Sequence, residues 1–307
     1  MGELLEQNNI PLLVIAGPTA SGKTALAVKL ALQRGGEVVS ADSMQVYRGM
    51  DIATAKPSAE ELAAVPHHLI GFADPGERFS VAQYAPLARA AIADIHRRGK
   101  LPILCGGTGL YLQAVTEHLV LPEAACNPAY RAALEARDTP ALYQELLTAD
   151  PHTKTNPNDR KRILRALELY VSTGLTIAEQ NEISRRLPSP YAARMIFLNP
   201  GDRQALYQRI DARVDEMFAR GLLEEARQWR QTKAETAAQA IGYKELEPYF
   251  QGARTLEEAA QGLKRATRRY AKRQLSWFRR MAAEWNAREP GSCRELFGEP
   301  QSGEAAF

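Results

Sequence analysis

Cysteine is scarce in this sequence of 307 residues. The three cysteines, Cys105, Cys126 and Cys293, are widely spaced, and none belongs to a C-x-x-C pair or lies beside a cluster of histidines. This pattern argues against a zinc site and fits a reducing cytoplasm.

Long apolar runs and an export signal are also lacking. No stretch approaches the roughly 20 apolar residues that a membrane-spanning helix needs. The first nine residues contain two glutamates and no lysine or arginine, and the apolar residues that follow lead directly into a glycine-rich loop. We therefore expect a cytoplasmic protein with no membrane partner.

Acidic residues are missing from one long segment near the C-terminus. Residues 264–280 contain eight lysines and arginines and no aspartate or glutamate. On a helical wheel, six of these basic side chains fall on one face and apolar side chains on the other. A solvated helix face usually carries charges of both signs, so this pattern indicates an anionic partner, and nucleic acid is a candidate.

The order of the expected elements indicates an α/β fold with a parallel sheet. Short apolar runs at 11–16, 37–41, 101–105 and 195–198 predict strands, and amphipathic segments at 24–32, 81–97 and 203–219 predict helices. The segment 116–190 shows helical patterns only, so we expect an all-helical insertion domain between residues 1–115 and 191–307 of the core. The tail beyond residue 287 is poor in apolar residues and is expected to fray.

A phosphate-binding loop follows the first predicted strand. The segment GPTASGKT matches G-x-x-x-x-G-K-[ST] in full and lies between a strand and a helix, as this motif requires. Its glycines let backbone N–H groups surround phosphate oxygens, the lysine adds a cation, and the threonine hydroxyl can bind Mg²⁺. ATP is the default ligand of such a loop. The residues concerned are Gly17, Pro18, Thr19, Ala20, Ser21, Gly22, Lys23 and Thr24.

The next two strands end in polar loops that we expect at the same edge of the sheet. Asp42 follows the second strand, and Thr108 follows two glycines after the third. Ligands bind beyond the carboxyl ends of parallel strands, so these loops are predicted to meet the phosphate loop at one site. The Asp42 carboxylate has two chemical uses there, holding Mg²⁺ through water or acting as a general base. A solvated loop aspartate is the alternative.

Seven motifs in the same order resemble the tRNA dimethylallyltransferases, also called tRNA isopentenyltransferases or IPP transferases. They are GPTASGKT at 17–24, SADSMQVYRGMDIATAKP at 40–57, GGTGLY at 106–111, NDRKRILRALE at 158–168, RVDEMFARGL at 213–222, QAIGYKE at 239–245 and TRRYAKRQLSWFRR at 267–280. The resemblance implies a P-loop NTPase-like core and transfer of a dimethylallyl group from dimethylallyl diphosphate to N6 of adenine 37 of tRNA. No ATP is consumed in that reaction. The sequence lacks the C-terminal Cys/His finger of the eukaryotic members.

The resemblance also implies roles for individual residues. The catalytic residues are Asp42 as the base on N6, with Lys23, Thr24 and Arg213 acting on the diphosphate. Mg²⁺ is the implied cofactor and Thr24 its implied ligand. Arg209 is the alternative to Arg213, which matches the family motif better. Ser43, Met44, Gln45 and Thr108 are expected to line the channel that receives the adenine.

The implied partner is tRNA with an adenine-rich anticodon loop, bound by a monomer. The expected tRNA contacts come from the channel residues, from the insertion, from the QAIGYK segment and from the basic helix. Outside the channel they are Arg131, Lys161, Arg162, Ile163, Leu164, Arg165, Gln239, Ala240, Ile241, Gly242, Tyr243, Lys244, Arg268, Arg269 and Lys272.

Three other functions fit the phosphate loop. A small-molecule kinase would use the loop for ATP and Asp42 to activate an alcohol, but it leaves the basic segments unexplained. An isopentenyltransferase acting on free adenine nucleotides would share the core, yet it needs no surface to hold an RNA stem. A non-enzymatic nucleotide-binding module would have no use for Asp42 beside an intact loop.

Overall fold

The computed structural model describes residues 10–117, 119, 127–186, 189–230, 237 and 240–298. The chain divides into two compact units, one made of residues 1–112 and 190–307 and the other of residues 113–189. The second unit is the helical insertion expected from the sequence. It begins three residues earlier and ends one residue earlier than we expected.

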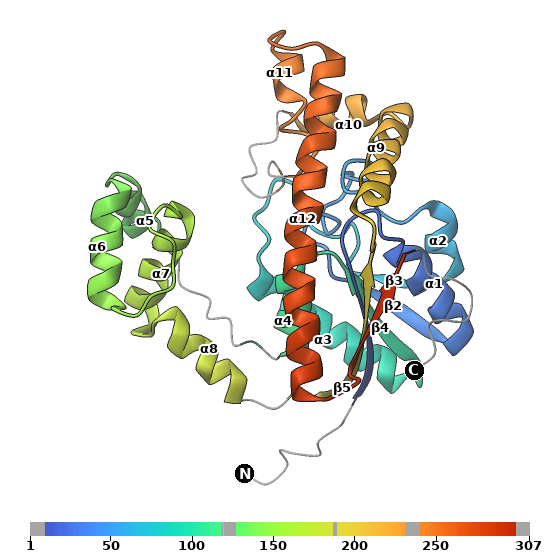
Figure 1. The fold of residues 1–307 in the computed structure, drawn as a ribbon, viewed down its shortest axis with the longest axis horizontal. Coiled ribbons are helices and arrows are strands. Elements are labelled where there is room, and N and C mark those ends of the chain that lie inside the picture. The colour runs from blue at the N-terminus through green and yellow to red at the C-terminus, as the bar shows by residue number, and fades with distance from the viewer. Residues whose placement is uncertain are drawn as a thin grey trace. The chain divides into compact units, whose positions relative to one another are not determined.

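The first unit is built on a six-stranded sheet in which all strands are parallel (Figure 1). This confirms the predicted fold class. The strand order is β3-β2-β4-β1-β5-β6, which places β1 between β4 and β5. The strands are β1 (Ile10–Ala16), β2 (Gly36–Ser40), β3 (His67–His68), β4 (Leu101–Gly106), β5 (Tyr191–Asn199) and β6 (Cys293–Phe297).

The last strand corrects an expectation. Residues beyond 287 were expected to fray, but 293–297 form β6, which pairs with β5. Cys293 and Leu296 are buried against the sheet, and the Asn286 side chain holds Cys293 by accepting from its N–H and donating to its carbonyl. Two buried side chains and two hydrogen bonds from the Asn286 amide therefore hold in place a segment whose composition is that of a loop.

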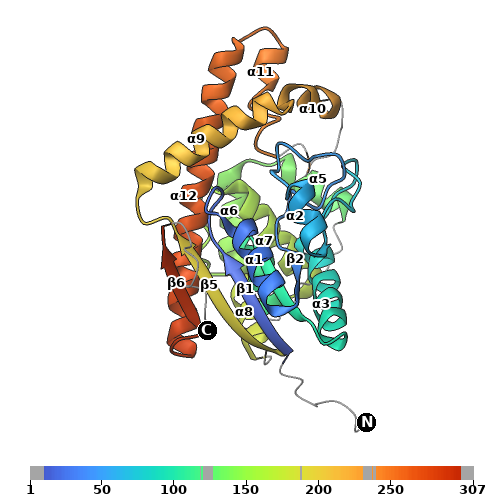
Figure 2. The same cartoon turned by 90° about the vertical axis from the view of Figure 1, so that its right-hand side faces the viewer.

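Helices cover both faces of the sheet, as Figures 1 and 2 show. Alternate residues along the strands point to opposite faces. On one face, Leu13, Ile15 and Ile196 form a core with α1 (Lys23–Arg34). On the other face, Phe197 packs against Phe278 of α12 (Leu256–Arg288), and α3 (Val81–Arg97) lies against β1, β2 and β4. Burial on both faces explains why these strands are continuous apolar runs.

A second apolar cluster lies beyond the sheet and supports the segment that follows β2. Val46, Tyr47 and Met50 of that segment are fully buried together with Leu222 and Leu263. The helices that contribute are α9 (Arg203–Ala219), α10 (Leu222–Trp229), α11 (Glu247–Phe250) and the first turns of α12. The remaining helices that belong to this unit in whole or in part are α2 (Ala59–Ala64) and the start of α4 (Gly109–Thr116).

The regular secondary structure among the described residues of the second unit is all helical, and the unit has its own small core. Its helices are α5 (Pro128–Glu135), α6 (Thr139–Ala149), α7 (Arg160–Thr173) and α8 (Ile177–Arg186). Asn127, Asp138 and Asp159 cap the first three of these helices with side-chain oxygens, and Gly174 ends α7 in the left-handed conformation. Leucines and an isoleucine from α5, α6 and α7 pack together inside it.

Candidate functional site

Three loops meet at the carboxyl edge of the sheet. The register pairs Ala16 at the end of β1 with Gly106 at the end of β4, and Cys105 with Ser40 at the end of β2. The connections from β1 and β4 leave in opposite directions, which is the condition for a ligand crevice in such sheets. A cavity of about 450 Å³ lies there, lined by residues of all three loops, of α9 and of α12. The expected convergence of these loops is confirmed.

The loop after β1 has the shape of an anion cradle. Ala20 and Gly22 have positive φ angles of 60° and 83°, which turn the backbone inward just before α1 begins at Lys23. The Cβ atom of any other residue would strain the chain at Gly22. The amino end of α1 and the cavity-lining residues 19–25 therefore face the same space. Backbone N–H groups at such a helix start attract phosphate oxygens.

Two side chains of this loop are prepared for a negatively charged ligand. The Lys23 ammonium donates to the Pro18 carbonyl at 2.6 Å, and burial lowers its pKa from 10.5 to about 8, with a smaller decrease from the nearby Arg213 guanidinium. The Ser21 hydroxyl is buried and has no hydrogen-bond partner within the described part of the chain. A phosphate oxygen would stabilise the charge on Lys23 and satisfy the Ser21 hydroxyl.

Asp42 lines the same cavity, and its carboxylate has a fixed orientation. Its Oδ1 atom accepts hydrogen bonds from the backbone N–H groups of Met44 at 2.9 Å and Gln45 at 3.4 Å. Its Oδ2 atom accepts no hydrogen bond from any described residue and lies toward Gly107. One carboxylate oxygen thus holds the side chain in place, and the other remains for a ligand.

Thr108 ties the loop after β4 to the loop after β2. Its hydroxyl accepts from the Ser43 N–H at 3.0 Å, and its own N–H donates to the Ala41 carbonyl at 3.1 Å. Ser43, Met44 and Gln45 line the cavity as expected, whereas Thr108 lies beside it and positions Ser43.

Residues 53–57, which follow the Asp42 loop in the chain, also line the cavity and are held by two side chains. The Gln45 amide donates to the carbonyls of Thr54 and Ala55 at 3.3 and 3.1 Å. Where this segment begins, the buried Glu225 carboxylate accepts from three successive backbone N–H groups, those of Asp51, Ile52 and Ala53. Sequence reasoning missed Glu225 because a glutamate in the first turn of a helix is ordinary.

The structure distinguishes the two candidate arginines of α9. The Arg209 guanidinium donates to the Ala20 carbonyl at 3.1 Å, so it braces the phosphate loop from outside. Arg213 lines the cavity, where its contact with the Ala55 carbonyl is long, at 3.5 Å. Burial lowers the pKa of Arg213, and an anion in the cavity would oppose that effect. Arg213 is therefore the better placed of the two to meet a diphosphate.

Two further cavity residues on α12 were not expected from the sequence. Gln274 is buried and hydrogen-bonds to both the phosphate loop and the loop after β4. Arg273 is exposed overall and lines the cavity. The helical wheel left out Gln274, which is uncharged, and Arg273, which falls outside the basic face, and it gave no information about which loops the helix meets.

The basic face of α12 is partly neutralised by α9. Arg268 forms a bidentate pair with Asp211, and Lys264 pairs with Asp215 at 2.6 Å. The acidic residues that the segment lacks are thus supplied by another helix, and Arg268 is a structural residue rather than a free cation. The basic residues of α12 that stay exposed are Arg265, Arg269, Lys272, Arg273, Arg279, Arg280 and Arg288.

The QAIGYK segment divides between core and surface. Ala240 and Tyr243 are buried, and the Tyr243 hydroxyl donates to Glu225, which removes the Tyr243 side chain from the expected RNA surface. Ala240 lines the cavity despite its burial. Ile241 and Lys244 line the cavity, and Gly242 adopts a φ of 122°. Gln239 lies outside the described residues.

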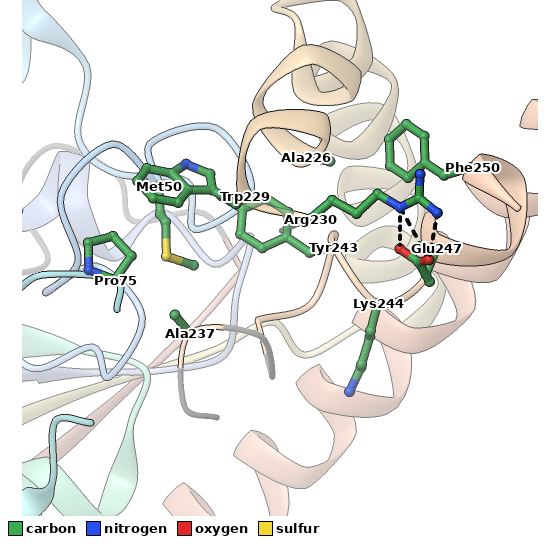
Figure 3. Close-up of a pocket in the computed structure, with 10 residues that line it drawn as sticks. All are labelled: Met50, Pro75, Ala226, Trp229, Arg230, Ala237, Tyr243, Lys244, Glu247 and Phe250. Atoms are coloured by element: carbon green, nitrogen blue, oxygen red, sulfur yellow. Dashed lines mark hydrogen bonds and ion pairs between the residues drawn. The ribbon is translucent and has the colours of Figure 1, made fainter. Parts of the chain in front are cut away.

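Lys244 also borders a second cavity of about 300 Å³, shown in Figure 3. Its walls include Met50, Trp229 and Phe250, and the Arg230 guanidinium lies over the Phe250 ring while pairing with Glu247. The Trp229 indole N–H donates to the Gly49 carbonyl at 2.9 Å. The charged groups Arg230 and Glu247 on the wall of this cavity are therefore paired with each other.

The insertion residues show a similar division. Ile163 and Leu164 are 0% and 3% exposed in the core of the unit, so their side chains are not available to RNA, which corrects that expectation. Arg131 pairs with Glu135 and Glu168, and Arg162 pairs with Asp159. Lys161 and Arg165 are exposed and form no ion pair within the described part of the chain. Free positive charge on α7 therefore comes chiefly from these two residues.

The described residues contain no preformed metal cluster and no membrane helix. Among residues 10–117, 119, 127–186, 189–230, 237 and 240–298, no three histidine, cysteine, aspartate or glutamate side chains gather in a group that could hold a metal ion. In the same residues no helix has both the length and the apolar character needed to cross a bilayer.

The chain is similar to proteins of one known family. A family model described as IPP transferase matches residues 45–281, and a model described as isopentenyl transferase matches residues 10–69. A tRNA dimethylallyltransferase of Roseiflexus sp. (strain RS-1) is 50% identical to this chain, over 89% of the chain and 91% of the relative.

Two solved structures are similar over most of the chain. The full-length tRNA isopentenylpyrophosphate transferase of Bacillus halodurans is 42% identical, with a TM-score of 0.67 and coverage of 96% of this chain and 92% of its own. A eukaryotic dimethylallyltransferase, described as acting on tRNA, is 33% identical, with a TM-score of 0.81 and coverage of 94% and 74%. The chain belongs to the IPP transferase family.

Proposed function

We propose that this protein transfers a dimethylallyl group from dimethylallyl diphosphate to N6 of adenine 37 in the anticodon loop of tRNA, releasing pyrophosphate. The observation that carries the proposal is that one cavity is lined by both the anion cradle and the oriented Asp42 carboxylate. The names of the relatives and family membership support it.

The phosphate loop binds the leaving group in this proposal. Pyrophosphate gains negative charge as the bond from carbon to oxygen breaks, and preorganised donors lower the barrier by stabilising that charge. Lys23, Ser21 and the loop N–H groups contact the diphosphate from one side, and Arg213 contacts it from the other. The loop therefore binds a diphosphate in the place where related folds bind ATP.

The residues present also fit a magnesium ion. Thr24, at the start of α1, and Asp42 both line the cavity. Mg²⁺ commonly keeps several waters and takes few protein ligands beside phosphate oxygens, so the lack of a carboxylate cluster in the described residues is compatible with it. When bound, the ion would neutralise charge on the diphosphate.

Asp42 is the base on the acceptor. The N6 amine of adenine is a weak nucleophile because its lone pair is delocalised into the ring. Asp42 Oδ2 accepts a hydrogen bond from N6 and then its proton, while the N6 lone pair forms the new bond to carbon. The electron pair of the broken bond between carbon and oxygen leaves with pyrophosphate.

An adenine within a stacked RNA loop must leave the stack to reach this cavity. The exposed basic side chains of α12 and the unpaired Lys161 and Arg165 of α7 supply phosphate-backbone contacts that hold the RNA. A free nucleotide would need no such basic surface, so these side chains favour transfer to RNA over transfer to a free nucleotide. A tRNA substrate also places the activity in the cytoplasm, and we propose that a monomer carries it out.

The proposal is tested by incubating the protein with labelled dimethylallyl diphosphate, Mg²⁺ and either tRNA or AMP. We expect label in tRNA and none in AMP. Label in AMP would support the nucleotide-specific alternative, and label in neither acceptor would contradict prenyl transfer by this protein.

A further inference from the structure

The side chain of Gln274 joins the two halves of the cavity. The Gln274 carbonyl oxygen accepts from the Thr19 N–H of the phosphate loop at 2.9 Å, and its NH₂ donates to the Gly107 carbonyl of the loop after β4 at 2.8 Å. The side chain is 5% exposed and reaches both loops from the middle of α12.

The two loops that Gln274 joins hold different substrates in the proposed reaction. The phosphate loop holds the diphosphate of the donor. The loop after β4 contains Thr108, which binds Ser43 and so sets the position of the Asp42 loop. The distance between these loops therefore determines whether the reacting carbon of the donor meets N6 of the adenine. Small errors in such a distance lower reaction rates strongly.

The fit between Gln274 and its neighbours is close. A Cβ atom at position 107 would lie 2.5 Å from the Gln274 nitrogen, so glycine is required there for this contact. One turn further along α12, Trp277 fills the space beside Gly109 in the same way. Ala271 packs with Ile210 of α9 and with Ala20 of the phosphate loop. The contacts of α12 therefore lock both loops to one rigid element.

The chemistry of the amide explains why glutamine stands here. Thr19 presents a donor and Gly107 presents an acceptor, so the bridging group needs one acceptor and one donor in a fixed arrangement. A carboxylate offers acceptors only, and a methionine side chain of similar length offers no comparable donor. A protonated carboxylic acid, however, has the same pattern as the amide.

We propose that Gln274 is a positioning residue that fixes the phosphate loop relative to the Asp42 and Thr108 loops, so that donor and adenine are aligned for transfer. The proposal rests on the proposed function of the cavity. It assigns to α12 a role in catalytic geometry in addition to its exposed basic surface. Because Gln274 touches loops rather than the reacting atoms, its removal should lower kcat and leave RNA binding largely unchanged.

The test compares Gln274→Met and Gln274→Glu with a matched variant on the same helix. Gln261→Met removes an amide that bonds only to Glu257 of the same helix, and it should retain full activity. We expect Gln274→Met to lower kcat for tRNA prenylation by roughly tenfold or more, with KM for tRNA changed by less than about threefold. An unchanged kcat in a variant with a normal circular dichroism spectrum would overturn the proposal.

The pH dependence of Gln274→Glu provides a second readout. Its activity relative to wild type should rise as pH falls, because the protonated carboxyl regains one donor and one acceptor. The ratio for Gln274→Met should stay constant across the same range. A flat ratio for Gln274→Glu would contradict the bridging role. If the wild type transfers no dimethylallyl group to tRNA, the proposed function fails instead, so the two failures are distinguishable.

Discussion

Replacing Glu225 with glutamine is expected to release the segment that forms one wall of the cavity. The buried Glu225 carboxylate accepts four hydrogen bonds at 2.7–2.9 Å. Oε2 accepts from the N–H groups of Asp51 and Ile52, and Oε1 accepts from the Ala53 N–H and the Tyr243 hydroxyl. In glutamine one oxygen becomes an NH₂ group. In the Oε2 place the NH₂ group faces two backbone N–H donors. In the Oε1 place it faces the Ala53 N–H, while the Tyr243 hydroxyl can turn to accept from it.

The magnitude follows from these contacts. A hydrogen bond to a charged acceptor contributes about 1.5–3 kcal/mol. Losing one or two of them predicts a decrease in the free energy of unfolding of about 1.5–3 kcal/mol, from the lower end of the range per bond, because the freed N–H groups of an opened loop can bind water. Residues 53–56 line the cavity, so kcat/KM for prenyl transfer should also fall, by roughly tenfold.

Urea unfolding followed by tryptophan fluorescence reports on the structural unit that contains the cavity. The protein's three tryptophans, Trp229, Trp277 and Trp285, all belong to the unit that contains the cavity. Glu224→Gln makes the same change of charge at the neighbouring exposed position and serves as the control. Equal unfolding curves for the two variants, with equal activity, would refute the reasoning about Glu225.

Three further predictions concern the cavity and the RNA surface. Asp42→Ala should lower kcat by about 10²–10⁴-fold with tRNA affinity unchanged in a filter-binding assay, and near-normal turnover would remove Asp42 from the base role. The affinity for pyrophosphate, measured by calorimetry, should weaken as pH rises through about 8, because Lys23 is charged below that pH, and Lys23→Met should abolish this trend. Arg269→Ala should lower the salt slope of tRNA binding by about one, whereas Arg268→Ala should chiefly lower the unfolding temperature, because Arg268 is paired with Asp211. Equal salt slopes for Arg269→Ala and wild type would exclude a phosphate contact at that residue.

The sequence was sufficient for the features that local patterns encode. The phosphate loop is a contiguous motif between a buried strand and a helix, so its position and its neighbours followed directly. Asp42 could be placed at the same edge because parallel strands end together, and the register of β2, β4 and β1 agrees. These features depend on the order of elements along the chain and need no tertiary detail.

The features that sequence reasoning missed are contacts between distant segments. Gln274 and Thr19 are 255 residues apart, and Glu225 and Asp51 are 174 residues apart. Neither glutamine nor glutamate on a helix signals a distant loop. The same reason explains why two further features were not foreseen. They are the ion pair of Arg268, whose acidic partner lies on α9, and β6, whose pairing with β5 compensates for its few apolar residues.

The central claim, that the cavity joins a prenyl diphosphate to an adenine of tRNA, is tested most directly by locating the product. The protein would be incubated with Mg²⁺, labelled dimethylallyl diphosphate and tRNA carrying adenine or guanine at position 37, and the digested RNA analysed by mass spectrometry. We predict one dimethylallyl group on N6 of adenosine 37 and no label in the guanine variant. Equal labelling of both RNAs, or of neither, would contradict the account.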